Sequence, residues 1–296
     1  MKSRFRDAVE RFACVTVLAV FLAGCAGTEP SVRTAEQSPA GRGPVLPAHL
    51  QEKIRLSETL GEALYASAAM ATLGAGVMTE KVGDAKAAGV CGTIVFSEGG
   101  GGAGGSGSWM VEFFTNLKDP RVAYQVRLVS AGAGDVKKEF KVFKPPRKPA
   151  DGELLLHRAI RRAVEAIPDR PDQPVTPVVL PGVVLGEDGL LVYLLAGSSR
   201  DNVAVFGKHY RVLVSLDGQR AVKVEPLSGD VLETELGAPQ QDGTRPFLYV
   251  THLLGDYPLE THVFLNRLHR TDLYVLTDKY TWRIHDGAIQ LDSVRK

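Results

Sequence analysis

The chain has 296 residues, of which 44% are hydrophobic and 23% are charged, and these fractions are those of an ordinary globular protein with a core. The formal net charge is +1 and no segment gathers six like charges, so the composition argues against a nucleic-acid-binding protein. The longest apolar run has about 11 residues, whereas a helix needs about 20 to cross a bilayer. No membrane-spanning helix is therefore expected.

The N-terminal segment has the pattern of a secretion signal. Its first eleven residues are cationic, an uncharged run from Phe12 to Leu22 follows, and the run ends in Leu22-Ala23-Gly24-Cys25. This order resembles a bacterial lipoprotein signal peptide with its lipobox, which implies cleavage before Cys25 and acylation of that cysteine. The alternative is an ordinary secretory signal cleaved near Ala23.

The same resemblance implies a location in the cell envelope. Acyl chains contribute about 0.8 kcal/mol per buried methylene, so lipid on Cys25 would hold the protein at a membrane. Ala26 stands where an aspartate retains enteric-type lipoproteins at the inner membrane, which favours the periplasmic side of the outer membrane. We therefore expect a signal peptide (1–24), a lipidated cysteine with a disordered proline-rich linker (25–47) and an α+β domain (48–296).

The cysteines leave no pair for a disulfide in the mature chain. Of the three cysteines, Cys14 leaves with the predicted signal peptide and Cys25 carries the lipid, so Cys91 alone keeps a thiol. Cys91 lies in the apolar stretch 90–96, which predicts a buried and inert side chain. The domain is expected to depend on core burial for its stability.

In the first half of the domain, the sequence predicts one helix before a group of strands and a second helix after it. Helical spacing of apolar residues predicts a helix over residues 49–73, ended by Gly74 and Gly76. A second helix is predicted to begin at Asp151 as its N-cap and to stop at Pro168. Runs rich in Val, Ile, Phe and Tyr predict four strands between the helices, at residues 93–97, 109–115, 122–129 and 138–143.

The second half of the domain is predicted to contain strands alone. Prolines are frequent over residues 144–181, and a boundary between two cores is considered there. Beyond Pro181, residues 210–215 and 220–225 alternate apolar and polar, as in a half-buried antiparallel ribbon. Type I′ hairpin turns are predicted at three Asp-Gly pairs, at residues 188–189, 217–218 and 286–287. The predicted fold class is α+β, with mainly antiparallel β-sheet and two helices.

A glycine-rich segment, residues 99–108, matches G-x-G-x-x-G at Gly99, Gly101 and Gly104. A dinucleotide fingerprint requires a helix after these glycines, but residues 109–114 have the pattern of a strand. No Gly-Lys-Ser/Thr of a P-loop follows, and the G-x-S-x-G pattern of a nucleophile elbow is incomplete. We interpret the segment as a flexible hairpin loop and expect no cofactor.

The densest polar cluster lies in residues 251–264 and holds His252, Asp256, Glu260 and His262, which are donors that zinc accepts. If residues 259–266 form a strand, Glu260 and His262 share a face. A hairpin loop over residues 255–258 would then place His252 on the opposite face, so a bulge would be needed to complete a metal site. The alternative is that these are solvated or hydrogen-bonded sheet residues.

Two other polar stretches are less specific. Residues 206–211 mix cations and aromatic rings and could bind an acidic or sugar ligand, or form a polar sheet face. His157 with Arg158, Arg161 and Arg162 makes a basic patch, for which an ion pair from Arg161 to Glu165 is the simpler account. His269 and His285 lie next to predicted turns and are expected to be exposed.

Three short sequence segments of the second half, at residues 192–196, 207–211 and 260–264, resemble segments in a group of proteobacterial proteins of unknown function. That resemblance implies a shared domain and no activity. Taken together, the patterns predict a lipid-anchored envelope lipoprotein that is a non-enzymatic binding or structural module. Its partners would be the membrane, through Cys25, and an envelope protein or glycan bound at sheet edges or the glycine-rich hairpin. The alternative is a metal-dependent hydrolase that uses His252, Glu260 and His262.

Overall fold

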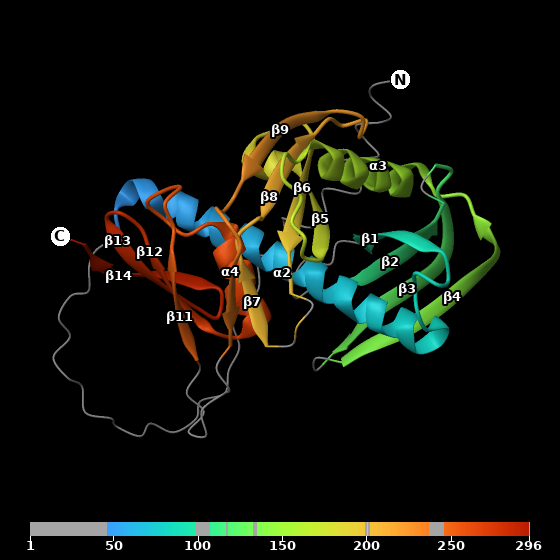
Figure 1. The fold of residues 1–296 in the computed structure, drawn as a ribbon, viewed down its shortest axis with the longest axis horizontal. Coiled ribbons are helices and arrows are strands. Elements are labelled where there is room, and N and C mark those ends of the chain that lie inside the picture. Colours follow the sequence, from blue (N-terminus) through green and yellow to red (C-terminus); the bar gives the residue numbers. More distant parts are fainter. Residues whose placement is uncertain are drawn as a thin grey trace. The chain divides into compact units, whose positions relative to one another are not determined.

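The computed structural model describes residues 46–98, 107–116, 118–132, 135–198, 200, 202–236 and 246–295 (Figure 1). The predicted signal peptide, Cys25 and all but the last residues of the linker lie outside these residues, as does most of the glycine-rich segment. The described residues form three α-helices and 14 strands in mostly antiparallel sheets, which confirms the predicted α+β class. They divide into two compact units, residues 62–236 and residues 46–61 with 246–295. The boundary considered within residues 144–181 does not coincide with this division.

Helix α2 (Ala48–Val82) contributes to both units and is longer than predicted. Gly74 does not end it, because this glycine is needed for close packing: a Cβ there would lie 2.7 Å from Val111. Gly76 also lies inside the helix, whereas Gly83, with φ of +87°, follows its end. No helix in the described part of the chain is long and apolar enough to span a membrane.

The first sheet of the 62–236 unit is an antiparallel meander of β1 (Val90–Glu98), β2 (Ser108–Thr115), β3 (Arg121–Gly132) and β4 (Asp135–Arg147). These strands contain the four predicted between the helices. Val111 and Phe113 of β2 pack with Val77 and Met78 of α2 on one face. Phe114 packs on the opposite face, near residues of α3. Helices therefore cover both faces of this sheet.

Helix α3 (Asp151–Ala166) joins this sheet to the next one. Its N-cap is Ala150, one residue before the predicted Asp151, and the Glu153 carboxylate accepts the Ala150 N–H at 2.8 Å. The helix ends before Pro168, as predicted. Its buried residues Ala159 and Ala163 pack on the antiparallel sheet β5-β6-β8-β9. That sheet consists of β5 (Val175–Pro181), β6 (Leu190–Ala196), β8 (Tyr210–Val214) and β9 (Ala221–Pro226).

The connections of this unit test the predicted Asp-Gly turns. A 3-10 turn, η2 (Gly182–Leu185), precedes Asp188-Gly189, and at Asp217-Gly218 only the glycine has a left-handed φ, of +72°. The type I′ prediction is therefore wrong at both places, and is confirmed at Asp286-Gly287, where φ is +47° and +83°. A short ribbon of β7 (Val203–Phe206) and β10 (Leu232–Glu235) completes the unit.

The prediction that the second half of the domain contains strands alone is wrong, because the second unit also contains a helix. β11 (Phe247–Thr251), α4 (Glu260–His269) and β12 (Asp272–Leu276) form a parallel crossover unit, and β13 (Tyr280–His285) and β14 (Ala288–Val294) extend the sheet by hairpins. The hairpin predicted at residues 255–258 and the strand predicted at 259–266 are therefore wrong. Pro258 before the segment, Glu260 in its first turn and basic residues in its last turn are signals of the helix that forms instead.

The first part of α2 packs closely on α4. A Cβ on Gly61 would lie 2.4 Å from Val263 Cβ and 2.9 Å from the carbonyl oxygen of Glu260, so only glycine fits at this contact. The Glu58 carboxylate also accepts the Ile289 N–H at 2.7 Å, which ties α2 to β14. Both contacts lie within the second unit.

We predict opposite effects for two glycines of α2. Gly61→Ala should lower the free energy of unfolding by about 1–3 kcal/mol because the added methyl overpacks the contact with Val263. Gly76→Ala should raise it by up to about 1 kcal/mol, because nothing lies within 4 Å of its Cβ and alanine has the higher helix propensity. Chemical denaturation of both variants checks the pair. Equal effects of the same sign would contradict the packing.

Candidate functional site

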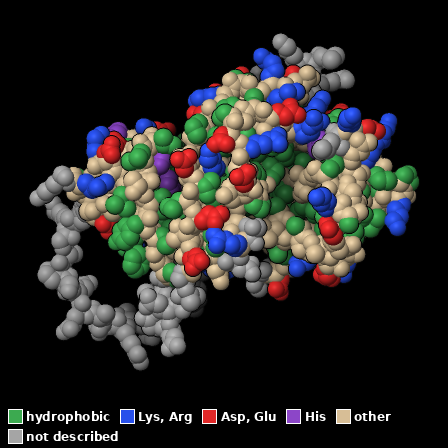
Figure 2. All heavy atoms as spheres, viewed as in Figure 1, with side chains coloured by type: hydrophobic (Ala, Val, Ile, Leu, Met, Phe, Trp, Pro, Cys, Tyr) green, Lys and Arg blue, Asp and Glu red, His purple; other side chains and the backbone are tan. Residues whose placement is uncertain are grey.

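An exposed aromatic strip lies on the sheet of the second unit. Phe247 and Tyr249 of β11 are 56% and 62% exposed, whereas Val250, which follows Tyr249 and points to the opposite face, is buried. Tyr249 pairs in register with Tyr274 of β12, and their ring centroids are 5.1 Å apart. Phe247 contacts both tyrosine rings edge-on, at 5.9 and 6.1 Å. Hydrophobic side chains are seen over β11 at the lower left of Figure 2. Exposed apolar groups gathered in this way mark interaction sites.

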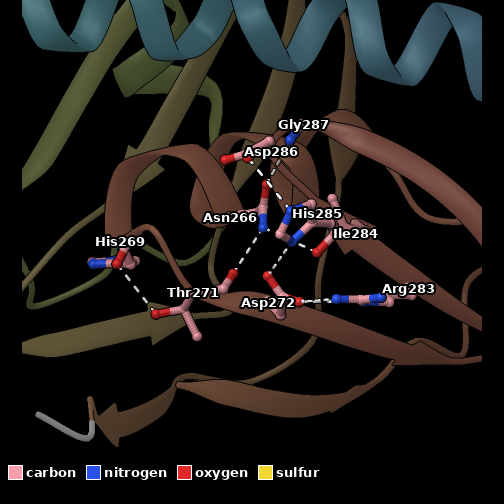
Figure 3. A network of polar contacts seen from close by, with 9 residues as sticks. All are labelled: Asn266, His269, Thr271, Asp272, Arg283, Ile284, His285, Asp286 and Gly287. Carbon is pink, nitrogen blue, oxygen red and sulfur yellow. Dashed lines mark hydrogen bonds and ion pairs between the residues drawn. The ribbon is translucent and has the colours of Figure 1, made fainter. Parts of the chain in front are cut away.

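A polar network centred on Asp272 lies on the same sheet as the aromatic strip, and Figure 3 shows the residues of this network. Asp272 is the register partner of Phe247, and its Oδ2 accepts from Arg283 Nε at 3.2 Å and Nη2 at 2.7 Å. Its Oδ1 lies 2.7 Å from His285 Nδ1. Burial raises the pKa of Asp272, but the hydrogen bonds from Arg283 and His285 outweigh it and lower the pKa below its ordinary value. The ionised carboxylate thus holds two half-exposed side chains in place.

Asn266 of α4 ties together the backbone beneath this network (Figure 3). Its side-chain amide donates to the carbonyl oxygens of Thr271 at 2.7 Å and Ile284 at 3.1 Å, and its oxygen accepts the Gly287 N–H at 2.8 Å. Asn266 is 2% exposed, so all three bonds are buried. One side chain therefore joins α4, the start of β12 and the turn between β13 and β14.

We call the six residues of this surface the open-face patch: Phe247, Tyr249, Asp272, Tyr274, Arg283 and His285. The pair of Asp272 and His285 resembles the way that a carboxylate orients a catalytic base, but the second ring nitrogen of His285 lies 3.5 Å from the Asp286 carboxylate rather than beside a nucleophilic hydroxyl. Aromatic rings and a fixed arginine are the groups enriched where proteins bind partners. The patch therefore suits binding better than group transfer.

The predicted metal candidates are buried on and near α4. The rings of His252 and His262 are 4.9 Å apart, so the structure brings these two together. Glu260 and His262 are two residues apart on a helix, where they do not share a face as they would on a strand. His262 Nδ1 accepts the Leu259 N–H at 3.0 Å and is thus not available to a metal. Over the described ranges, no group of three His, Cys, Asp or Glu side chains is arranged to hold a metal ion.

The other polar stretches are ion-paired or buried. Arg161 and Arg162 both contact Glu165, as the helix spacing suggested. Lys208 pairs with Asp169, and Arg211 Nε donates to Glu225 at 3.0 Å. These contacts satisfy the cations of residues 206–211 within the protein.

The exposure of His209, of His269 and His285, and of Cys91 can be compared with what the sequence suggested. His209 is fully buried, accepts the Ala196 N–H at 3.1 Å, and burial lowers its pKa to about 4. His269 and His285 are half-buried rather than simply exposed. Cys91 is exposed, so the prediction of a buried thiol is wrong; in β1 it donates to the Phe114 carbonyl at 3.3 Å.

A buried carboxylate cluster in the first unit was not predicted. Arg147 of β4 donates to Glu112 of β2 at 2.5 Å and to both oxygens of Glu153 of α3, at 2.7 and 2.9 Å. Gln125 also donates to Glu112, at 2.7 Å. Burial, and then the nearby Glu153 carboxylate, raise the pKa of Glu112 to about 7. The cluster joins four elements, β2, β3, β4 and α3, and the Glu112 side chain is 0% exposed, which fits a structural role.

A scan against protein-family models, a search of curated proteins and a search of solved structures each find no match for this chain.

We predict that Asn266→Ala destabilises the second unit by about 2–4 kcal/mol, because it removes three buried hydrogen bonds and leaves the Gly287 N–H without its acceptor. Gln290→Ala, an exposed change on neighbouring β14, should alter stability by less than about 0.5 kcal/mol. Urea denaturation measures both. A loss at Asn266 no larger than that at Gln290 would show that the network does not stabilise the unit.

We predict that Glu112→Gln changes how stability depends on pH. Because the folded pKa of Glu112 is raised from 4.5 to about 7, its contribution is complete below pH 4.5 and is lost as the pH rises through 7. Glutamine does not titrate, so the variant should gain on the order of 1–3 kcal/mol relative to wild type between pH 4.5 and 7.5. Denaturation at a series of pH values checks this. Parallel curves would mean that the pKa of Glu112 is not raised.

Proposed function

We propose that the protein is a lipid-anchored lipoprotein of the cell envelope and that it acts as a non-enzymatic binding module. The lipobox-like Leu22-Ala23-Gly24-Cys25 supports the anchor, with Cys25 as the lipidated residue and the outer membrane as its location. The linker that follows would hold the folded units away from the lipid surface.

The observation that supports binding most directly is the open-face patch. Exposed rings of Phe247 and Tyr249 lose water on contact with a partner, and each aromatic side chain buries about 150–250 Å². Arg283 is already held by Asp272, so little side-chain entropy remains to be lost when it hydrogen-bonds a partner. A sheet with Asn266 beneath it provides the rigid support that a preorganised surface needs.

The metal-dependent hydrolase receives less support from the same unit. The helix formed by residues 260–269 separates Glu260 from His262, and His262 Nδ1 already accepts a backbone hydrogen bond. Among the residues that the structure describes, the two histidine rings have no third ligand placed to complete the three-ligand site that activates water on zinc.

Cross-linking in intact cells, followed by capture of the full-length protein, tests the proposal. We expect wild type to capture a specific envelope component and Cys25→Ser to lose it, because the unlipidated protein leaves the membrane surface. The double variant Tyr249→Ala with Arg283→Ala should lower capture at least about tenfold, since losing two anchoring side chains costs about 1–2 kcal/mol each. The control is Val222→Ala with Arg220→Ala, which removes an exposed apolar side chain from β9 and an exposed arginine from the turn before it.

Two outcomes would contradict the proposal. Capture that is equal in the patch variant and its control would show that the open-face patch is not the binding surface. Turnover of a substrate by the purified protein, abolished by His262→Ala, would favour the hydrolase instead.

A further inference from the structure

The edge strands of the sheets differ in how they are protected against pairing with other strands. Natural edges carry charges, prolines or bulges that prevent this pairing. Three kinds of residue protect most of these edges: β4 is rich in lysine, β5 contains a proline, and β9 and β10 carry charges. The edges β1 and β14 pair with their neighbours through bulged registers, and β7 is buried. Among edges in the described ranges, β11 alone is exposed and lacks charge, proline and bulge.

The pairing of β11 with β12 determines which of its backbone groups remain open. The Pro246 carbonyl accepts from Asp272 N at 3.0 Å, and the His252 N–H donates to the Leu276 carbonyl at 2.8 Å, so both residues direct their backbone groups toward β12. Backbone direction alternates along a strand, so residues 248 and 250 also face β12. The N–H and C=O groups of residues 247, 249 and 251 therefore face the free edge.

The sequence of β11 is complementary to itself about Tyr249. In an antiparallel pair centred there, Tyr249 lies opposite Tyr249 of a second copy, and Phe247 lies opposite Thr251. These are the residues whose backbone groups face the edge, so each pair can exchange two hydrogen bonds. Leu248 and Val250, on the face that α4 covers, also lie opposite each other and extend the apolar layer. No two like charges meet.

We propose that β11 pairs with β11 of a second copy of this chain, giving a two-fold symmetric dimer with a continuous eight-stranded sheet. The two-fold axis is perpendicular to the sheet, so both open-face patches lie on one side and their aromatic strips adjoin. A two-fold contact is the commonest way in which identical chains associate, and it satisfies an edge that is otherwise open. The inference does not depend on lipidation or on the identity of a partner.

The first test is the mass of the full-length protein, measured by light scattering in detergent. Thr251→Pro removes an N–H that faces away from β12, a position where an edge strand tolerates proline. It removes one hydrogen bond on each side of the axis, so the dimer dissociation constant should rise at least about tenfold, whereas the matched Thr251→Ala should remain a dimer. A monomeric wild type at all concentrations, or a dimer unaffected by Thr251→Pro, would overturn the proposal.

The second test keeps the proposal falsifiable if Thr251→Pro fails to fold. In a background with Cys14, Cys25 and Cys91 each replaced by serine, a short thiol cross-linker should join two copies through Tyr249→Cys, because the paired Cα atoms lie about 5.5 Å apart. Thr251→Cys should not react with its own counterpart, which lies about 13 Å away along the partner strand. Equal cross-linking at both positions, or cross-linking of Tyr249→Cys to an extended segment of a different protein, would overturn self-pairing.

This test is separate from that of the proposed function. A Thr251→Pro monomer that still captures its partner would leave the binding role intact while confirming that the dimer uses β11. A wild-type dimer that captures nothing would uphold the dimer and reject the binding role.

Discussion

The parallel pairing of β11 with β12 is the constraint on which the second unit depends. Parallel neighbours require a crossover, and α4 provides it, buried between the sheet and the first part of α2. Because α4 covers one face of the sheet, the residues of β11 on that face are apolar, and the remaining ones, Phe247, Tyr249 and Thr251, are left exposed. The same pairing directs alternate backbone groups to the free edge. The aromatic surface and the open edge are thus two consequences of one topology.

The sequence predicts local structure well where the side-chain period is clear. The four strands of the first sheet and helix α3 follow directly from runs of Val, Ile and Phe and from helical spacing. Gly74 shows the limit: a glycine in a helical pattern is read as a stop, but its packing against Val111, remote in the sequence, keeps it inside α2. Cys91 shows another, since an apolar neighbourhood does not place a side chain on the buried face of an edge strand. Such outcomes depend on tertiary contacts that periodicity does not contain.

The open-face patch does not follow from the sequence pattern, because its members are far apart along the chain, unlike the histidines and carboxylates of residues 251–264. Its members come from three strands, and only the register brings Tyr249 beside Tyr274 and Asp272 beside Arg283. One signal was present, since Leu-Tyr-Val occurs at residues 248–250 and again at 273–275, the stretches that pair in register. The misassigned strand at 259–266 had the larger effect, because a helix there converts a supposed hairpin into a crossover. The start and end signals of α4, from Pro258 to the basic residues of its last turn, would have corrected it.

The central claim is that the β11 side of the second unit is the surface by which this protein meets other molecules. Amide hydrogen exchange resolved to single residues, compared between the dilute protein and the protein in envelope membranes, tests it most directly. In the dilute protein, the amides of residues 247, 249 and 251 should exchange rapidly and those of 248 and 250 slowly. In membranes, the first three should become protected. Fast exchange of residues 247, 249 and 251 under both conditions would contradict the account, because it would mean that nothing occupies this edge.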